Sequence, residues 1–277
     1  MQANSIINNL SHIHNKQPWL VMNAAEKFTI ENSTHPDISH FYTFEASATK
    51  QTPMAIPDGC IDLLFDCDSN TANAEVFGTP LEATKIDLIT DHRYFGVRYK
   101  SGVMPDFLNI SAQEITGNHY QLNNLIPSSN QLVEQINQQQ DFSTQVDIFN
   151  QFMNSKVQRT HSPITSMIIH EINKRQGNVK IKDLEEITGF SSRTLQRKFH
   201  GNMGMSAKTY SRIVRCQSAI YKINHDDKIT FLDLAFDLGF TDQPHFLKEF
   251  KKLVSTTPLN YQSKVKHESY LKKIDCI

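Results

Sequence analysis

The chain has few cysteines and no apolar run long enough to cross a membrane. Its four cysteines, Cys60, Cys67, Cys216 and Cys276, form no CxxC pair, which excludes a disulfide scaffold and disfavours a zinc cage. No segment approaches the roughly 20 apolar residues that span a bilayer. Residues 1–20 lack a basic stretch followed by an apolar core, so we expect no signal peptide, no membrane partner and a cytoplasmic protein.

The 277 residues carry almost no net charge, with a formal value of −1. This balance hides a division near residue 160. The first part holds 9 Lys and Arg against 17 Asp and Glu, and the second holds 19 against 12. A chain of this length is expected to form two domains. The excess of basic residues in the second part favours a polyanionic partner for that domain.

Residues 1–125 alternate short apolar runs with turn clusters, a pattern typical of strands. The expected strands cover residues 40–45, 60–66, 75–77, 86–89 and 94–99. Several short strands at this spacing predict an antiparallel β-barrel or sandwich. The first domain is therefore expected to be rich in β-structure.

Between residues 126 and 155 the apolar period becomes helical. The apolar positions that share a face are Leu132, Val133 and Ile136 in one helix, and Val146, Phe149 and Met153 in the next. These two helices either pack on the β domain of the same chain or pair with a second copy as a homodimer. The polar residues 156–162 predict a linker, after which Ser162-Pro163 is a suitable helix start.

The helical region 163–265 contains an internal repeat with a spacing of 50–51 residues. The matched positions are Asp183-Leu184 with Asp233-Leu234, Gly189 with Gly239, Leu195 with Phe246, Arg197 with Lys248, and Phe199 with Phe250. Each copy predicts a short helix, a turn at the glycine and a second helix, which is the layout of a helix-turn-helix unit. The expected structural residues are Leu184, Gly189, Leu195 and Phe199 in the first unit, and Leu234, Ala235, Gly239, Phe246 and Phe250 in the second.

The second helix of the first unit, about 192–200, has a polar face with the donors that read DNA. Its members are Arg193, Gln196, Arg197 and His200, spaced at i, i+3, i+4 and i+7. Arginine pairs with guanine and glutamine with adenine in the major groove. We therefore predict that this helix contacts bases, whereas one such helix alone would fit a merely solvated face.

In the second unit the corresponding helix is expected at about 243–251, with Asp242 as its cap. The residues at or near its outward face are Gln243, His245, Leu247, Lys248 and Lys251. Leu247 has two interpretations. It either contacts a thymine methyl group or belongs to the core of the unit.

Two segments of this region resemble the AraC/XylS family of transcription regulators. They are Gly189-Phe-Ser-Ser-Arg-Thr-Leu-Gln-Arg-Lys-Phe199 and residues 233–251, followed by Thr257-Pro-Leu-Asn-Tyr261. The resemblance covers about residues 163–262. It implies two helix-turn-helix subdomains joined by a long helix at about 206–222, each placing its second helix in a major groove. The first unit has Glu185 where this family usually has a small Ala.

The N-terminal part is similar, less specifically, to the sensory part of some of these regulators. The similarity rests on residues 56–65, Ile-Pro-Asp-Gly-Cys-Ile-Asp-Leu-Leu-Phe, and residues 95–99, Phe-Gly-Val-Arg-Tyr. It implies a cupin-like β-barrel, the usual place for an effector, and helices that often dimerise. The whole chain is therefore expected to be an α+β protein: a sensory domain at 1–125, helices at 126–155, a linker at 156–162, the DNA-binding domain at 163–265 and a tail at 266–277.

Polar side chains of the first domain do not form a recognisable catalytic set. The three histidines His40, His92 and His119 lack metal-ligand spacing, so we expect no metal and no cofactor. The carboxylates Asp58, Asp62 and Asp66 recur every four residues and are interpreted as surface or turn groups.

The leading hypothesis is a sequence-specific DNA-binding transcription regulator, expected to be an activator as is the habit of the family. Its partners would be double-stranded DNA, RNA polymerase and a small-molecule effector. One alternative is control by a protein partner. Another is an alkylation-repair methyltransferase, an enzyme that shares this DNA-binding module but needs a cysteine-rich metal site or an activated cysteine. The basic part offers only Cys216 and Cys276, so we expect a protein without enzymatic activity.

Overall fold

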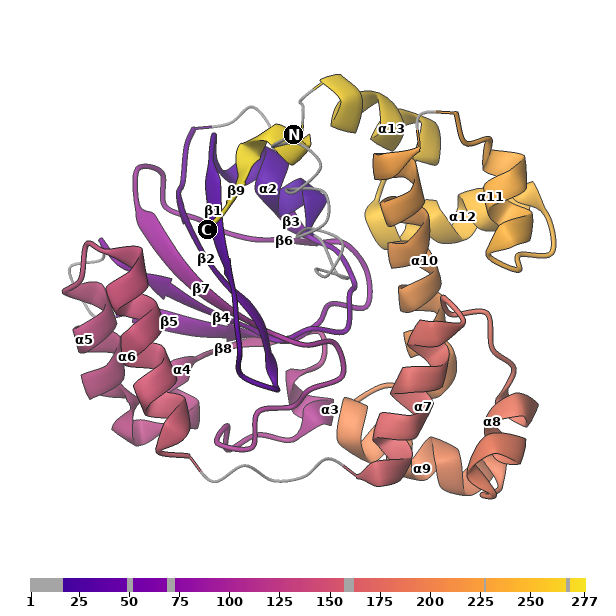
Figure 1. Cartoon of the computed structure of the whole chain (residues 1–277), viewed down its shortest axis with the longest axis horizontal. Coiled ribbons are helices and arrows are strands. Elements are labelled where there is room, and N and C mark those ends of the chain that lie inside the picture. Colours follow the sequence, from indigo (N-terminus) through magenta and orange to yellow (C-terminus); the bar gives the residue numbers. More distant parts are fainter. Residues whose placement is uncertain (1–16, 49–51, 69–72, 157–161, 227, 268–269) are drawn as a thin grey trace.

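The computed structural model describes residues 17–48, 52–68, 73–156, 162–226, 228–267 and 270–277. Figure 1 shows two parts, a sheet with flanking helices and an all-helical part, joined by the segment that follows α6. The expected α+β class is confirmed, with the sheet first and the helices second. Most of the linker expected at 156–162 lies outside the described residues.

Seven strands form one mixed sheet in the order β8-β5-β4-β7-β2-β1-β9. Their bounds are β1 Phe28–Asn32, β2 Ile38–Glu45, β4 Asp62–Asp66, β5 Asn73–Phe77, β7 Arg93–Tyr99, β8 His119–Gln121 and β9 Ile274–Cys276. A separate hairpin pairs β3 Met54–Ala55 with β6 Thr84–Lys85. The sheet has two end strands, β8 and β9, and so curves as an open sheet rather than the closed barrel that the spacing suggested.

Four of the five expected strands are present, and one is not. Residues 86–89 form no strand, because the apolar Ile86 is buried against the core while the chain there turns back toward β7. Five strands were not expected from the sequence: β3, β6, β8 and β9, which have only two or three residues, and β1, which has five. In the centre of the sheet, Gly96 on β7 lies opposite Tyr42 on β2. The Tyr42 ring occupies the space above this glycine, since a Cβ added at Gly96 would lie 2.1 Å from the ring.

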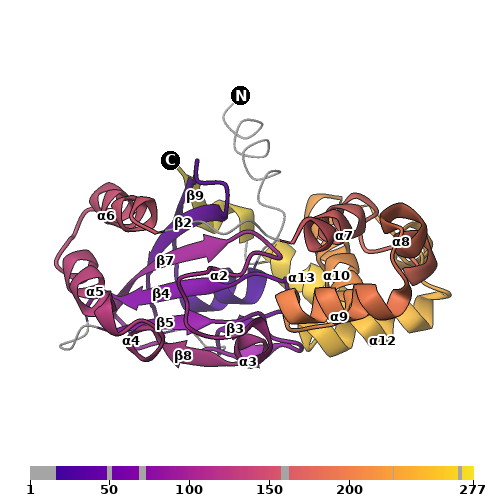
Figure 2. The ribbon, with the colours of Figure 1, turned by 90° about the horizontal axis from the view of Figure 1, so that it is seen from below.

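The helices between the sheet and the second part pack on the sheet of their own chain. They are α5 Asn130–Asn137 and α6 Phe142–Asn154, preceded by α3 Ala112–Ile115, α4 Leu122–Leu125 and the short 3-10 turn η1 Pro127–Ser129. All six apolar residues expected to share helix faces are buried in one core with the side chains of β2, β4 and β7. These faces are therefore occupied within the chain (Figure 2).

The second part consists of seven helices in the described residues. Their bounds are α7 Pro163–Lys174, α8 Ile181–Thr188, α9 Ser192–Met203, α10 Ala207–His225, α11 Phe231–Asp237, α12 Gln243–Val254 and α13 Pro258–His267. The pairs α8–α9 and α11–α12 are the two copies of the repeat. Gly189 and Gly239 both have positive φ, 72° and 70°, which lets the chain turn sharply between the helices of each pair.

The two recognition-type helices begin with different caps. Asp242 accepts a hydrogen bond from the backbone N–H of His245 at 2.7 Å, as expected for an N-cap. Ser191 is the N-cap residue of α9 but makes no side-chain cap bond. Instead the carboxylate of Glu185 accepts the backbone N–H of Ser192. The acidic residue that departs from the family pattern thus supplies the missing cap, while Leu184 beside it is buried.

The C-terminal tail returns to the first domain. After the 3-10 turn η2 Tyr270–Lys273, strand β9 pairs in parallel with β1, with Phe28 opposite Ile274. The ammonium of Lys273 donates to the backbone oxygens of Met22 and Ala25 at 3.1 and 3.0 Å. These two carbonyls lie at the end of helix α2 Pro18–Ala24. Residues from both ends of the chain therefore share one core with the second helix-turn-helix unit.

Candidate nucleic-acid interface

The polar face expected on α9 is exposed. Arg193, Gln196 and Arg197 all lie at the surface, as does Lys198 beside them. The apolar side of the same helix faces inward, where Leu195 and Phe199 are 2% and 0% exposed. The helix therefore presents the predicted polar face to solvent, His200 included, while its opposite side is packed in the core.

The fourth residue of that face, His200, touches the sheet domain. Its Nδ1 atom lies 2.9 Å from Nε2 of Gln113 on α3. Near the same end of α9, the hydroxyl of Thr116 donates to the backbone oxygen of Met203 at 3.3 Å. The C-terminal end of the first recognition-type helix is thus held by α3, while its N-terminal end is free of such contacts in the described residues.

On α12 the outward residues divide into two groups. His245, Lys248 and Lys251 are exposed, whereas Gln243 and Leu247 are half-buried. Leu247 packs against the core, as the second of its two interpretations expected, but it is only partly buried. The rest of its side chain is accessible to solvent. The remaining structural residues of the unit, Leu234, Ala235, Phe246 and Phe250, are all buried.

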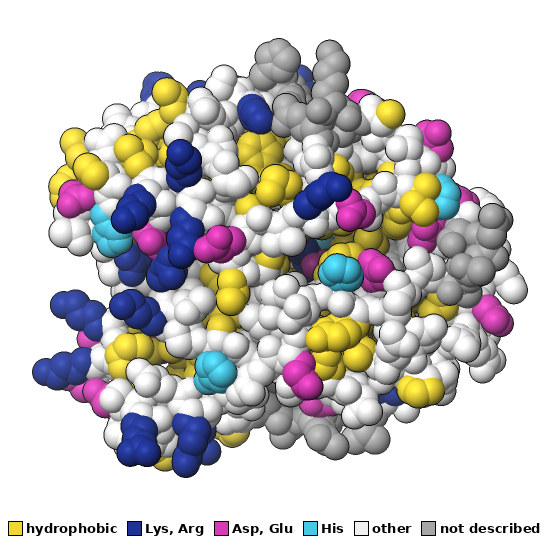
Figure 3. Space-filling model, turned by 180° about the vertical axis from the view of Figure 1, so that it is seen from behind, with side chains coloured by type: hydrophobic (Ala, Val, Ile, Leu, Met, Phe, Trp, Pro, Cys, Tyr) yellow, Lys and Arg dark blue, Asp and Glu magenta, His cyan; other side chains and the backbone are white. Residues whose placement is uncertain are grey.

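Helices α9 and α12 lie on the same side of α10. Figure 1 places them at different heights along α10, and Figure 2 places both of them on the side away from α7 and α8. Viewed from that side, Lys and Arg side chains gather over the helical part, while the sheet part shows few (Figure 3). Two exposed polar faces on one basic side are the arrangement expected of a protein that follows one face of a DNA duplex.

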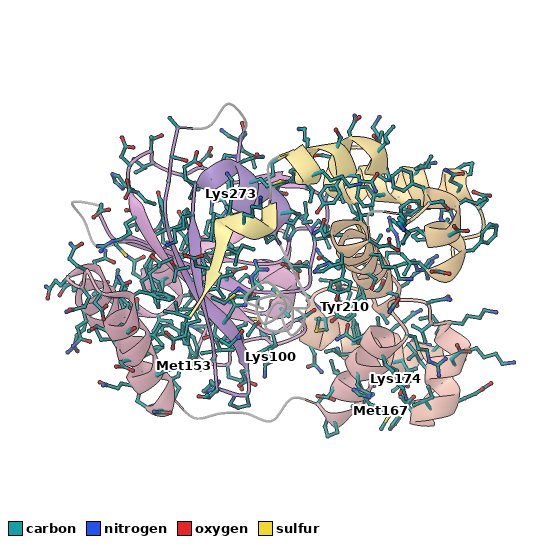
Figure 4. The ribbon with its side chains drawn as sticks, turned by 45° about the horizontal axis from the view of Figure 1, so that its top comes forward. Lys100, Met153, Met167, Lys174, Tyr210 and Lys273 are labelled. Atoms are coloured by element: carbon teal, nitrogen blue, oxygen red, sulfur yellow. The ribbon has the colours of Figure 1, made fainter. Side chains whose placement is uncertain are left out.

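The helical part is joined to the sheet domain through the loop at residues 56–60. Gln217 of α10 donates to the backbone oxygen of Pro57 at 2.7 Å. The hydroxyls of Ser101 and Tyr210 lie 2.6 Å apart, and Ser101 also donates to the backbone oxygen of Asp58. Figure 4 shows Tyr210 at this junction, on the side of α10 that faces the sheet. A Cβ added at Gly59 would lie 2.6 Å from the Tyr210 ring, so the loop presses directly on α10.

A second junction connects α2 to the last helices. The indole N–H of Trp19 donates to the backbone oxygen of Val254 at 2.9 Å. The Trp19 ring meets the ring of Tyr261 edge-on at 5.3 Å, and the Lys264 ammonium lies 5.2 Å from the indole centroid. Trp19 is 4% exposed, so this contact is part of the core.

The opposite side of loop 56–60 faces a buried ionic cluster. Arg98 donates to Asp58 at 2.7 Å and, through two nitrogens, to Asp62 at 2.9 and 2.7 Å. Gln17 also donates to Asp58, and the Tyr42 hydroxyl donates to Asp62. Sheet register explains the convergence, because Arg98 lies directly opposite Asp62 on the neighbouring strand. Interpreting Asp58 and Asp62 as surface groups was therefore wrong, although Asp58 does stabilise a turn by accepting the backbone N–H of Cys60 at 2.9 Å.

The third carboxylate of the series is buried as well. Asp66 is 5% exposed and lies 2.8 Å from Nδ1 of His92, so the surface interpretation fails here too. The three carboxylates nevertheless do not converge on one point. No group of three or more possible ligands is positioned to hold a metal ion within the described residues.

Burial changes the protonation of the cluster. Burial raises the pKa of Asp62, although the Arg98 charge opposes the shift. Burial also lowers the pKa of His40, to about 3, and the nearby Arg98 charge adds to this shift. His40 lies opposite Arg98 on β2 and is therefore a neutral ring at physiological pH. Beside the cluster is a cavity of about 60 Å³, lined among others by Gln17, Tyr42, Asp58, Asp62, Phe77 and Arg98.

The cysteine that a methyltransferase would need is not activated. Cys216 lies in the middle of α10 and is 5% exposed. Burial raises the pKa of its thiol well above the ordinary value, whereas a nucleophilic cysteine needs a lowered pKa and access to substrate. Cys276 lies on β9 in the sheet domain. Both observations argue against alkyl transfer.

Each part of the chain matches a known family model. A family model described as "Helix-turn-helix domain" matches residues 184–264, and one described as "Domain of unknown function (DUF6597)" matches residues 32–121. The "Probable transcription factor PqrA" of Proteus vulgaris is 32% identical over 89 residues, which cover 32% of this chain and 72% of that protein. The "F1 operon positive regulatory protein" of Yersinia pestis is 32% identical over 84 residues, or 30% of this chain and 28% of that protein.

Solved structures give weaker likenesses. The C-terminal domain of AraT, a response regulator from Geobacillus stearothermophilus, is 21% identical with a TM-score of 0.36, covering 38% of this chain and 88% of that domain. ToxT from Vibrio cholerae is 12% identical with a TM-score of 0.44, covering 82% of this chain and 98% of that one.

The chain is a DNA-binding transcription regulator of the helix-turn-helix class. Within that class it belongs to the AraC family, on the match to PqrA and the duplicated unit. Apart from PqrA, three curated relatives are matched over only 28 to 35% of their lengths. The chain therefore matches about a third of the length of these relatives. No helix in the described part of the chain is long and apolar enough to span a membrane.

Proposed function

We propose that the chain is a sequence-specific activator of transcription that inserts two recognition helices, about 192–200 and 243–251, into adjacent segments of the major groove. The observation that carries the proposal is the presence of two exposed, chemically different faces on one basic side of α10. Because both helices belong to one chain and their faces differ, one molecule would read an asymmetric site. No palindrome is required.

The proposed base contacts follow from the exposed side chains. On α9 they are Arg193, Gln196 and Arg197, with His200 at the end that α3 holds. Arginine would pair with guanine and glutamine with adenine. On α12 the proposed contacts are Gln243, His245, Leu247, Lys248 and Lys251.

The length of α10 supports a spacing of one DNA turn. Its 19 residues extend about 28 Å at 1.5 Å per residue. Units that read the same face of B-DNA lie about 34–36 Å apart. The packing of each unit at the ends of α10 can supply the remainder. A single chain would then cover roughly 15–20 base pairs.

The assignment as an activator rests on relatives alone. The Yersinia pestis relative is named a positive regulatory protein, and an activator of this type would contact RNA polymerase in the cytoplasm. Homodimerisation, if it occurs, would use surfaces other than the apolar faces of α5 and α6, because those faces are buried on the sheet.

The proposal is tested by selecting binding sites for the full chain from random duplexes and then footprinting the selected site. The full chain is the right sample, because α2 and β9 share a core with the second unit. We expect one chain to protect two neighbouring major-groove segments with different sequences. Protection that requires two chains on a symmetric palindrome would refute the tandem arrangement.

We further propose that the sheet domain regulates DNA binding through loop 56–60. One side of this loop contacts the small cavity through Asp58, and the other side contacts α10 through Tyr210 and Gln217. A small polar effector in the cavity would change the position of Asp58 and, through the loop, the position of α10. Control by a protein partner is the alternative, and it would act on the outer surface of the sheet domain.

The coupling is tested at the junction itself. Gln217→Ala removes the bond to the loop while leaving every proposed DNA contact in place. We expect a several-fold change in the affinity of the full chain for its selected site, with the preference over a scrambled duplex unchanged. Ser155→Ala on α6, an exposed side chain that bonds only within its own helix, serves as the control. Identical affinities for all three proteins would argue that the junction is only structural.

A further inference from the structure

A deep cleft separates the two helix-turn-helix units. Its volume is about 710 Å³, and its walls come from the start of α8, one side of α10 and one side of α12. Buried rings of Phe246 and Phe250 form part of its floor. In Figure 3 Lys and Arg side chains stand on both sides of the hollow that divides the helical part. The cleft thus lies between the two units, bordered by α12 of the second unit and by the start of α8 of the first.

The cleft is lined by more cations than carboxylates. Its charged and imidazole side chains are Lys180 from the start of α8, Lys208, Arg212 and Arg215 from α10, and His245 and Glu249 from α12. Glu249 is already paired, because its carboxylate lies 2.6 Å from Nε of Arg212. Lys180 and Lys208 are exposed and form no ion pair with a carboxylate in the described part of the chain. The cleft therefore has an unneutralised positive charge.

Arg215 connects the walls of the cleft. It donates to the backbone oxygen of Gly177 at 3.0 Å and approaches that of Gly239 at 3.5 Å. Gly177 precedes the first unit, and Gly239 is the turn of the second. The guanidinium also lies 5.0 Å from the centroid of the Phe240 ring. This one side chain thus links α10 to the backbone that precedes the first unit and to the turn of the second.

DNA geometry determines what faces this cleft. Two helices in adjacent major-groove segments on one side of a duplex are separated by the minor groove and by the phosphate strands along its edges. Those strands must pass the gap between the units. Duplex DNA carries one phosphate per roughly 1.7 Å of axis, so a strand that passes this gap brings closely spaced phosphates to it.

We propose that the cleft is a third DNA contact, a site for the sugar-phosphate backbone between the two major-groove segments, in which Lys208 and Lys180 each neutralise a phosphate. The inference rests on the proposed function, since it needs both recognition helices on one duplex. Lys208 belongs to α10, so the connecting helix becomes part of the interface. Such a contact adds affinity without reading bases, and it disfavours sites whose two halves have a different spacing.

The test measures binding of the full chain to its selected duplex by fluorescence anisotropy at several salt concentrations. The variants are Lys208→Gln and Lys180→Gln, and the control is Lys100→Gln, which removes the same charge from the sheet domain (Figure 4). Each lost phosphate contact should reduce the slope of log affinity against log salt by about 0.9. We expect that reduction in both cleft variants and none in the control, with the preference over a scrambled duplex unchanged.

Two results would overturn the inference. One is a salt slope for the cleft variants equal to that of the control. The other is a loss of preference for the selected site, which would mean that these lysines read bases. If the unmodified chain itself gives no selected site, the proposed function fails instead, so the two failures are distinguishable. Melting temperatures equal to that of the unmodified chain confirm that each variant is folded.

Discussion

Replacing Arg98 by methionine should destabilise the sheet domain strongly. The substitution Arg98→Met keeps an unbranched chain and removes the charge. The guanidinium is 5% exposed and makes three hydrogen bonds of 2.7 to 2.9 Å to two carboxylates. Removing one partner of a buried ion pair costs about 3–5 kcal/mol, because an uncompensated charge remains. With a typical unfolding free energy of about 5–15 kcal/mol, this is a large fraction of the total.

The loss in the Arg98→Met variant should depend on pH in a defined direction. Burial already raises the pKa of Asp62, and losing the neighbouring cation raises it further. A folded state that binds a proton more tightly than the unfolded state gains stability as pH falls. The difference in unfolding free energy between variant and unmodified chain should therefore shrink from pH 8 to pH 5.5. Each additional proton bound contributes at most about 1.4 kcal/mol per pH unit.

The assay is urea unfolding of both proteins followed by circular dichroism at pH 8 and pH 5.5. The double variant Arg98→Met, Asp62→Leu is a partial control, since it removes one of the two carboxylates that lose their cation, while Asp58 stays buried. It should recover part of the stability that the single variant lost. A single variant that loses less than about 1 kcal/mol at pH 8, or the same amount at both pH values, would refute the reasoning that an unpaired buried carboxylate dominates.

Three further predictions follow from the same structure. The pKa of His40 is lowered to about 3 from 6.5, so between pH 7 and pH 5 the unfolded chain takes up a proton that the folded chain does not. The unfolding free energy should therefore fall by about 2 kcal/mol over this range. Urea titrations should show that pH dependence in the unmodified chain and lose it in His40→Gln. Arg197→Ala should weaken binding to one half of the selected site, by about 1–3 kcal/mol for a bidentate contact, and Lys248→Ala should weaken binding to the other half. Equal losses on selected and scrambled duplexes in anisotropy assays would assign both residues to phosphates. Ile274→Ala should lower unfolding free energy by about 2–5 kcal/mol, because this β9 residue is 4% exposed in the shared core; an unchanged melting temperature would count against that.

Local patterns in the sequence were enough to determine the helical part. The repeat, the turn glycines at 189 and 239, and the cap at Asp242 act over a few residues, so spacing alone places the two units. Exposed positions on α9 follow from the same helical period. Four strands of the first domain were found from their apolar or alternating runs, whereas β3, β6, β8 and β9 were missed because two or three residues carry no periodic signal. The five-residue strand β1 was missed as well.

The way in which distant residues meet became visible in the three-dimensional structure. The carboxylates Asp58 and Asp62 converge on Arg98 because strand register brings positions about 40 apart together. Trp19 bonds to Val254 across 235 positions, and β9 completes a sheet that began with β1. Such contacts carry no local signal in one sequence, since side-chain period shows which face is apolar but not which partner covers it. Local sequence patterns therefore indicated a DNA-binding regulator, whereas the fold determined which residues connect its sheet domain to α10.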